Sequence, residues 1–259
     1  MQLELARTPQ QAVDAVVTHL RRPDVADDLR RDHLRIVTGP QPYRHAYYAW
    51  DQFFRFEPNL GAIHTVHGQR VLLTTGNFIR ALTEGVASQG SRDAQAVLER
   101  LGRAWAEATF RDFVPRVEQE FEIHFDKMGL GMVLETWWWP MRAAGWGSWH
   151  VDFRHARRGL VRINLSESMF VRALGRMGQP VCGWYSGMFA GVFSRLARRD
   201  LAAVEVSCVA ATSEASCTFL VGTPTRVRAA REARDQGAQV DEIIQCWLAP
   251  QPERAAATT

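Results

Sequence analysis

The sequence predicts an α+β fold in which an antiparallel β-sheet has helices packed on one side. Three observations predict it: helical periodicity dominates the first half, two hairpin patterns follow, and one helical pattern separates the hairpins. Composition agrees, because 46% hydrophobic and 23% charged residues are typical of a globular protein. We expect three segments, namely an N-terminal helical extension over 1–35, a main domain over 36–224, and a C-terminal helix with a disordered tail over 225–259.

The first half of the chain is predicted to be mainly helical. "TPQQAVDAVVTHL" (8–20) begins with a Thr–Pro start signal, and "PDVADDLRRDHL" (23–34) places Pro in a first turn. "AIHTVHGQRVLLTT" (62–75) alternates around a glycine and predicts a short hairpin. Apolar residues at helical spacing then predict helices over 75–88 and 91–114.

The second half predicts the sheet. "WHVDF" and "LVRINLS" flank the polar "RHARRG" and predict one hairpin, while "AAVEVSCV" and "CTFLVG" flank "AATSEAS" and predict another. Between them, about 181–198 predicts a helix. Pro224 should end the second hairpin, and 231–248 predicts one more helical segment.

Several classes of function are disfavoured by the sequence. Its apolar runs are too short to cross a bilayer, and the N-terminus shows no secretory pattern, so we expect a cytoplasmic protein without membrane contact. The net charge of +3 is spread along the chain, which argues against direct nucleic-acid binding. No phosphate-binding loop or Rossmann fingerprint indicates a nucleotide or redox cofactor.

Three of the four cysteines, together with one glutamate, have a spacing that suits a metal site. Cys182 opens the predicted helix, Glu205 and Cys208 share one strand, and Cys217 begins its partner. Residues three apart in a strand point to opposite faces, so Glu205 and Cys208 converge only if a bulge or strand end lies between them. Three thiolates and a carboxylate would form a closed set for structural zinc (Zn²⁺). The alternative is that these cysteines are small buried hydrophobic residues.

The segment from Gly145 to Pro224 resembles the 4-vinyl reductase domain family. The resemblance rests on a Gly-rich hairpin, the run "QPVC", a helix with repeated Gly and Ala, "VEVSC", a short turn and "CTF". It implies a fold of the type found in NO-signalling and Golgi-transport proteins. In the family's phenol-sensing activators, zinc is held by a cysteine, a glutamate and two cysteines in this order. The resemblance therefore implies Cys182, Glu205, Cys208 and Cys217 as the ligands.

The resemblance also directs attention to a ligand site. The phenol sensors hold the ligand hydroxyl with a histidine and a tryptophan, and the candidates here are His124, His150, Trp139 and Trp149. Ile163 lies near the position where those sensors place their tryptophan, and isoleucine donates no hydrogen bond. This departure puts phenol itself in doubt.

Two further patterns allow both a packing and a ligand-binding interpretation. Gly183, Gly187 and Gly191 clear one helix face, either for close packing on the sheet or to leave room for a ligand or partner helix. Trp184, Tyr185 and Phe189 supply apolar bulk on its other sides. The run "ETWWWPMRAAGWGSW" reads as a two-sided strand or an oligomer contact, or as the wall of an aromatic pocket. Carboxylates over 117–127 read as a solvated strand face or as a cation-binding pair.

Three functions remain open from the sequence. The first is a zinc-stabilised, homodimeric sensor for a hydrophobic, aromatic or tetrapyrrole-like molecule, with output through a separate protein because the chain ends soon after the domain. The second is a reductase or accessory protein of (bacterio)chlorophyll metabolism, as the family name implies. The third is a dimeric scaffold without a small ligand, since the fold resembles that of vesicle-tethering subunits.

Overall fold

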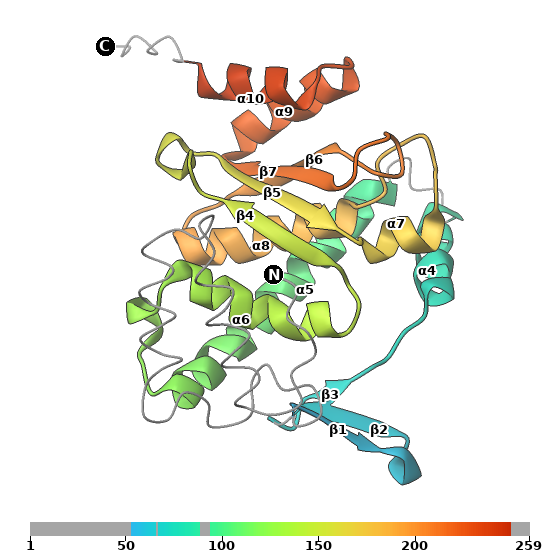
Figure 1. The fold of residues 1–259 in the computed structure, drawn as a ribbon, viewed down its shortest axis with the longest axis vertical. Coiled ribbons are helices and arrows are strands. Elements are labelled where there is room, and N and C mark those ends of the chain that lie inside the picture. The colour runs from blue at the N-terminus through green and yellow to red at the C-terminus, as the bar shows by residue number, and fades with distance from the viewer. Residues whose placement is uncertain (1–52, 66, 89–93, 250–259) are drawn as a thin grey trace. The chain divides into compact units, whose positions relative to one another are not determined.

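A computed structural model describes residues 53–65, 67–88 and 94–249 (Figure 1). The described chain divides into two compact units. Unit 1 comprises 53–78 and 108–148, and unit 2 comprises 79–107 and 149–249. The predicted helical extension over 1–35 and the tail from 250 lie outside the described residues, and the predicted domain boundaries stay predictions.

Unit 1 contains a small antiparallel sheet. Its strand order is β1-β2-β3, with β1 at Phe54–Glu57, β2 at Ala62–Thr65 and β3 at Arg70–Val71. The pairing of β2 with β3 confirms the predicted hairpin. Between β1 and β2, the 3-10 helix η1 (Pro58–Leu60) ends at Gly61, whose φ of 58° suits a residue without Cβ.

The tryptophan run of unit 1 is helical, so its prediction as a strand is wrong. α6 spans Leu130–Ala143 and buries Trp137, Trp138 and Trp139 together. The Trp138 indole donates to the carbonyl of Gly147 over 3.2 Å. Aromatic residues favour strands when considered alone, but a helix covered by its surroundings buries three consecutive indoles without needing two opposite faces.

Two helices continue across the boundaries between the units. α4 spans Gly76–Ser88 and α5 spans Ala94–Phe121, which confirms both predicted helices. α5 runs through Pro115, so 117–121 is helical rather than extended. The 3-10 helix η2 (Phe125–Lys127) follows, and the predicted strand over 117–127 is therefore wrong.

Unit 2 is built on a four-stranded antiparallel sheet of order β4-β5-β7-β6. It contains both predicted hairpins, which confirms them. Helix α7 and the long helix α8 lie between the hairpins in the chain, and the 3-10 helix η3 lies between β4 and β5. Their bounds are β4 Ser148–Asp152, η3 Ala156–Arg158, β5 Val161–Ser166, α7 Met169–Leu174, α8 Gly183–Ala197, β6 Ala202–Ser207 and β7 Cys217–Gly222.

This sheet is covered on both faces (Figure 1). On one, which we call the α8 face, Phe219 of β7 packs edge-to-face on Phe189 of α8. On the other, the α10 face, Leu220 joins an aliphatic cluster with residues of α9 (Pro224–Asp235) and α10 (Val240–Leu248). The α+β class is thus confirmed, and the C-terminal helices add a second layer that the sequence did not predict.

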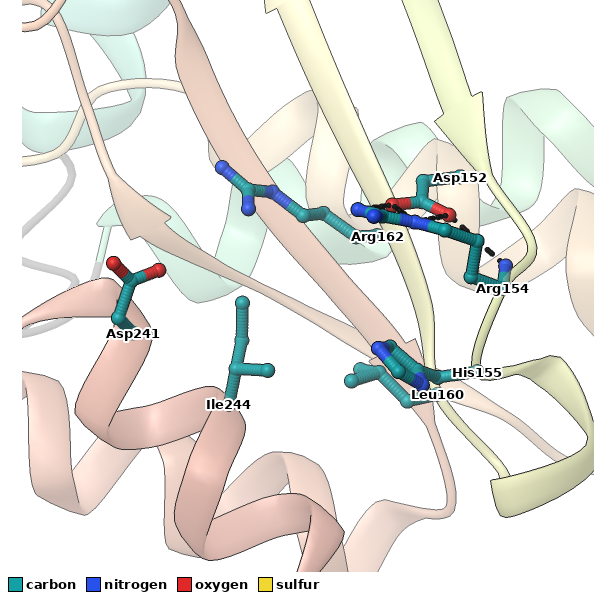
Figure 2. Close-up of a pocket in the computed structure, with 7 residues that line it drawn as sticks. All are labelled: Asp152, Arg154, His155, Leu160, Arg162, Asp241 and Ile244. Carbon is teal, nitrogen blue, oxygen red and sulfur yellow. Dashed lines mark hydrogen bonds and ion pairs between the residues drawn. The ribbon is translucent and has the colours of Figure 1, made fainter.

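The C-terminal segment differs in detail from its prediction. Pro224 begins α9 at its first turn, where a missing N–H costs no hydrogen bond. The predicted single segment is two helices, because the chain turns at Gly237 with φ 88°. Beside α10 the sheet is not fully covered, and a hollow remains between this helix, β4 and β5 (Figure 2).

The glycine stripe of α8 packs against α5 rather than against the sheet. A Cβ on Gly187 would lie 1.7 Å from the carbonyl oxygen of Glu99, and one on Gly183 would lie 2.7 Å from that of Gln95. In the reverse direction, a Cβ on Gly102 would lie 1.9 Å from the oxygen of Trp184. The space cleared by these glycines is therefore occupied by the backbone of a helix from the same chain.

Candidate metal centre

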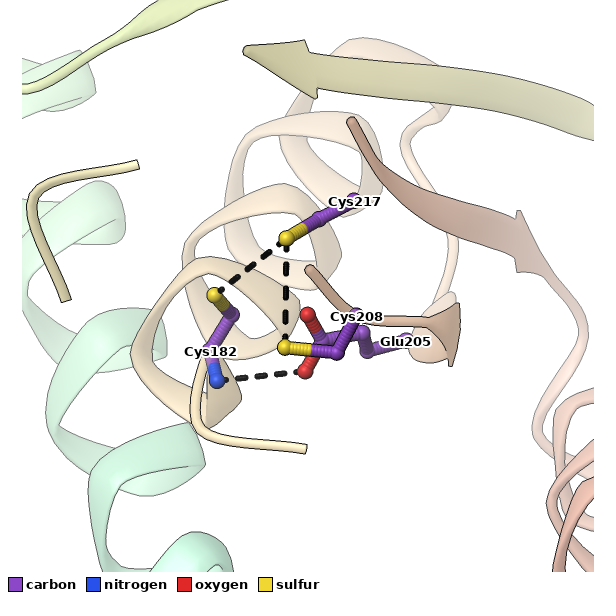
Figure 3. A group of neighbouring side chains, drawn as sticks. All are labelled: Cys182, Glu205, Cys208 and Cys217. Atoms are coloured by element: carbon purple, nitrogen blue, oxygen red, sulfur yellow. Dashed lines mark hydrogen bonds between the residues drawn. The ribbon is translucent and has the colours of Figure 1, made fainter. Parts of the chain in front are cut away.

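Four buried side chains meet where α8, β6 and β7 approach one another (Figure 3). Cys182 is the residue before α8, Glu205 lies in β6, Cys208 follows the end of β6, and Cys217 is the first residue of β7. The three segments are far apart in the chain only at Cys182. The hairpin brings the other three groups together locally.

A bulge in β6 allows Glu205 and Cys208 to converge. Glu205 pairs with Phe219, but Ser207 pairs with Thr218, so β6 advances by two residues while β7 advances by one. β6 then ends at Ser207. Both conditions that the sequence required for convergence, the bulge and the strand end, are therefore present.

The spacing of the ligand atoms suits a tetrahedral ion. All four atoms lie within 4.8 Å of one another. The sulfur atoms of Cys182 and Cys217 are 3.8 Å apart, and those of Cys217 and Cys208 are 3.9 Å apart. Zinc with bonds of about 2.3 Å separates two tetrahedral sulfur ligands by about 3.8 Å. The three cysteines are free thiols in the structure, so no disulfide accounts for this proximity.

The glutamate has one oxygen that awaits a partner. Oε2 of Glu205 accepts the backbone N–H of Cys182 over 3.1 Å. Oε1 is buried and has no hydrogen-bond partner within the described residues. Because an unpaired buried oxygen is costly, a metal bond to Oε1 would remove that cost. The residues present therefore fit a metal ion.

Burial also shapes the protonation of the set. Burial is the main cause that raises the pKa of Cys182 and of Glu205 well above their ordinary values. Hydrogen bonds from Cys182 and Cys217 lower the pKa of Cys208 to about 2, which makes Cys208 the thiolate of the group. The hydrogen bond with Cys182 lowers the pKa of Cys217, but the bond with Cys208 and burial raise that pKa overall. A divalent cation would allow all four groups to ionise.

Polar groups around the cluster orient its ligands. The Ser168 hydroxyl lies 3.2 Å from the sulfur of Cys182, and the backbone N–H of Val209 points to the sulfur of Cys217 over 3.5 Å. From the α10 face, Arg234 donates to the carbonyl oxygen of Glu205 over 2.8 Å. Such outer contacts fix the position of metal ligands.

Four of the predicted ligand-binding residues form one aromatic cluster on the α8 face. Trp149 stacks on Phe189 with ring centroids 5.0 Å apart, and Tyr185 stacks on the same ring at 6.4 Å. Trp184 packs edge-to-face on Tyr185 at 5.1 Å. Ile163 lies on this face, fully buried and opposite Phe219.

The other three predicted ligand-binding residues lie elsewhere. Trp139 belongs to unit 1, where it packs on Phe53 at 5.0 Å. His124 is also in unit 1 and is exposed at the start of η2. His150 is exposed on β4. The structure therefore does not join these three to the aromatic cluster within one unit.

Sequence reasoning did not find the hollow on the α10 face. Its volume is about 180 Å³, and β4, β5, the loop between them and α10 line it (Figure 2). The lining residues are Asp152, Arg154, His155, Leu160, Arg162, Asp241 and Ile244. Charges at 152–162 were visible in the sequence, but nothing indicated that the turn at Gly237 would return α10 to them.

Comparison with known proteins agrees with the resemblance predicted from the sequence. Residues 161–223 match the model of the 4-vinyl reductase domain, a segment that contains all four residues of the cluster. No protein with a curated description matches the chain. A solved structure with a similar fold is the phenol-responsive sensory domain of the transcription activator PoxR with phenol. It is 15% identical with a TM-score of 0.52, and the alignment covers 88% of this chain and 100% of that one.

Proposed function

We propose that this protein is a zinc-stabilised sensor module that binds a small hydrophobic, aromatic molecule. The observation that carries the proposal is the fold shared with a phenol-responsive sensory domain over 88% of the chain. The 4-vinyl reductase domain match over 161–223 and the aromatic cluster of the α8 face support it.

Zinc is the metal that the ligand chemistry favours. Three sulfurs and one carboxylate are a soft set that selects zinc over magnesium or calcium. Cys182, Glu205, Cys208 and Cys217 would occupy all four positions, so the ion would stabilise the fold and leave no site for substrate. By joining the start of α8 to β6 and β7, the four residues would hold the layer in which the aromatic cluster lies.

The ligand would enter the aromatic layer between the sheet and α8. Trp149, Trp184, Tyr185 and Phe189 supply flat apolar surfaces that suit an aromatic guest. The buried Tyr185 also brings a polar hydroxyl group to this layer. Ligand contacts by Trp139, His124 and His150 remain predictions, as do a homodimer, a cytoplasmic location and a separate output protein. Within the described residues, no helix combines the length and apolarity needed to span a membrane.

The experiment is a titration with phenol and larger aromatic compounds, followed by tryptophan fluorescence. Trp149→Phe should reduce the fluorescence change, because Trp149 lies in the proposed layer. Trp247→Phe is the matched control. Its indole is also buried but lies on the α10 face, where it donates to the carbonyl of Gly159 over 3.3 Å.

Equal responses in both variants would contradict this location. No response from the unmodified protein to any aromatic probe would remove the sensor proposal and favour a scaffold. A purified protein that carries visible colour would favour a tetrapyrrole, and with it the alternative role in (bacterio)chlorophyll metabolism. Native mass spectrometry of the same sample would report metal content and oligomeric state together.

A further inference from the structure

The hollow on the α10 face combines an apolar base with charged walls. Leu160, fully buried, and Ile244 form its apolar part. Figure 2 shows Arg162 reaching from β5 toward α10, while Asp241 lies on α10 beside Ile244. At about 180 Å³ the hollow is smaller than sites for drug-sized ligands, which occupy about 300–1,000 Å³. Its occupant must therefore be small.

One pair of charges in the wall is already satisfied. Asp152 accepts both the backbone N–H and the guanidinium of Arg154, with four contacts between 2.6 and 3.0 Å. This bidentate pair is neutral overall and leaves Asp152 little capacity for a ligand. The unmatched charges of the hollow are consequently those of Arg162 and Asp241.

Arg162 and Asp241 face the hollow without neutralising each other. No ion pair within 4.0 Å joins them, and neither has an ionic partner among 53–65, 67–88 and 94–249. Arg162 donates only its Nε, to Asn164 over 3.3 Å, which leaves both terminal nitrogens of the guanidinium available. Its cross-strand neighbour is Leu220 of the aliphatic cluster, so this charge stands at a position that packing alone would fill with an apolar residue.

We propose that this hollow binds a small aliphatic amino acid as its zwitterion. The carboxylate would accept two hydrogen bonds from the Arg162 fork, and the ammonium group would donate to Asp241. The aliphatic side chain would lie on Leu160 and Ile244. A simple anion would be repelled by Asp241 and a simple cation by Arg162, whereas a ligand with both charges satisfies both residues. This site is separate from the proposed aromatic site, which lies on the opposite face of the sheet.

Isothermal titration calorimetry of the full chain with L-alanine, L-valine and L-leucine tests the proposal. Isovalerate and isobutylamine are the matched probes, since each is valine with one charged group removed. We expect valine to bind, and each single-charge probe to bind at least about tenfold more weakly, because a charged hydrogen bond is lost. Arg162→Gln and Asp241→Asn should each weaken valine binding by a similar factor. The exposed Arg195→Gln, on α8, should have no effect.

Absence of saturable binding for all three amino acids would overturn the proposal. Equal affinity for valine and either single-charge probe would do so too, as would unchanged affinity in both hollow variants. Thermal unfolding of each variant shows whether it is folded, and the two substitutions are independent of each other. The phenol response, measured on the same samples, separates the proposals: Arg162→Gln should lose valine binding and keep that response.

Discussion

The two faces of the four-stranded sheet in unit 2 are stabilised in different ways. The α8 face depends on a few atoms at fixed distances, namely the metal-ligand cluster, stacked rings and glycines in contact with the backbone of α5. The α10 face depends on aliphatic area around Trp247 and leaves a charged hollow open beside it. Both are built from the same strands. Val204 and Val206 of β6 join the aliphatic cluster, while Glu205 between them joins the metal-ligand cluster.

This difference predicts where the fold is intolerant of change. A metal-ligand cluster loses its function when one ligand is removed, whereas an aliphatic cluster loses stability in proportion to the area removed. Substitutions on the α8 face should therefore have larger effects than substitutions on the α10 face, and the following predictions test this order from the largest effect to the smallest.

Removal of one metal ligand should have the largest effect. We expect Cys208→Ser to abolish metal retention and to lower the free energy of unfolding by at least about 4 kcal/mol, the linkage for a metal at 1,000 times its Kd. At 2–4 °C per kcal/mol, the Tm should fall by about 8 °C or more. Metal analysis and thermal unfolding measure both effects.

Cys246→Ser is the matched control for this change. Cys246 is the exposed cysteine of α10 and lies outside the cluster. Its substitution should leave metal content unchanged and the Tm within about 2 °C. Near-zero metal in the unmodified protein and in both variants would contradict the zinc proposal.

Close packing of α8 on α5 gives the second prediction. Gly187→Ala would place a methyl group 1.7 Å from a backbone oxygen of Glu99, which cannot move without displacing α5. We expect a loss of about 3 kcal/mol or more in the free energy of unfolding, measured by urea denaturation. Gly85→Ala on α4 is the control, since no atom would lie within 4 Å of its Cβ. It should stabilise the protein by about 0.5–1 kcal/mol through helix propensity, and a Gly187→Ala variant as stable as the unmodified protein would show that the two helices can separate at little cost.

Arg234 provides a test of whether the two faces are independent. It belongs to α9 but donates to the carbonyl of Glu205 at the bulge. Arg234→Met should cost about 1–2 kcal/mol in stability and also weaken metal retention in a chelator competition, because the bulge orients the Glu205 carboxylate. Arg228→Met, an exposed change on the same helix, should do neither. If Arg234→Met lowered stability without affecting metal retention, the faces would be energetically separate at this position.

The candidate metal centre could be predicted because its geometry is local. Glu205, Cys208 and Cys217 lie in one hairpin, and the period of two along a strand makes the need for a bulge a direct deduction. Only Cys182 comes from a distant element, and a helix packed on that hairpin places it. The alternation that predicted both hairpins of unit 2 is likewise a property of neighbouring residues.

Features that depend on distant packing could not be predicted in the same way. Trp137–Trp139 were assigned to a strand because aromatic residues favour strands, but the surroundings of α6 bury them in a helix. The glycine stripe indicated a close neighbour without indicating that α5 is that neighbour. The hollow depends on the turn at Gly237 returning α10 to β4 and β5, and neither strand carries a signal for it.

The smallest effect should come from the ion pair in the wall of the hollow. Hydrogen bonds from Arg154 lower the pKa of Asp152 below its ordinary value of 3.8, and burial opposes them. Because the pKa is lower in the folded state, the pair stabilises the protein above about pH 4, and this contribution is lost as the pH falls through the folded pKa. Asp152→Asn should therefore cost less than about 1 kcal/mol at pH 7, since Arg154 is exposed to solvent.

Urea denaturation at pH 7 and pH 3 measures this dependence. The stability difference between Asp152→Asn and the unmodified protein should shrink at pH 3, where the carboxyl group begins to protonate in both states. Glu167→Gln is the control, because the pair of Glu167 with Arg172 is exposed on both sides and its loss should change stability by less than about 0.5 kcal/mol. A cost for Asp152→Asn as large as that for Gly187→Ala would mean that the α10 face also depends on single atoms, and the proposed difference between the two faces would not hold.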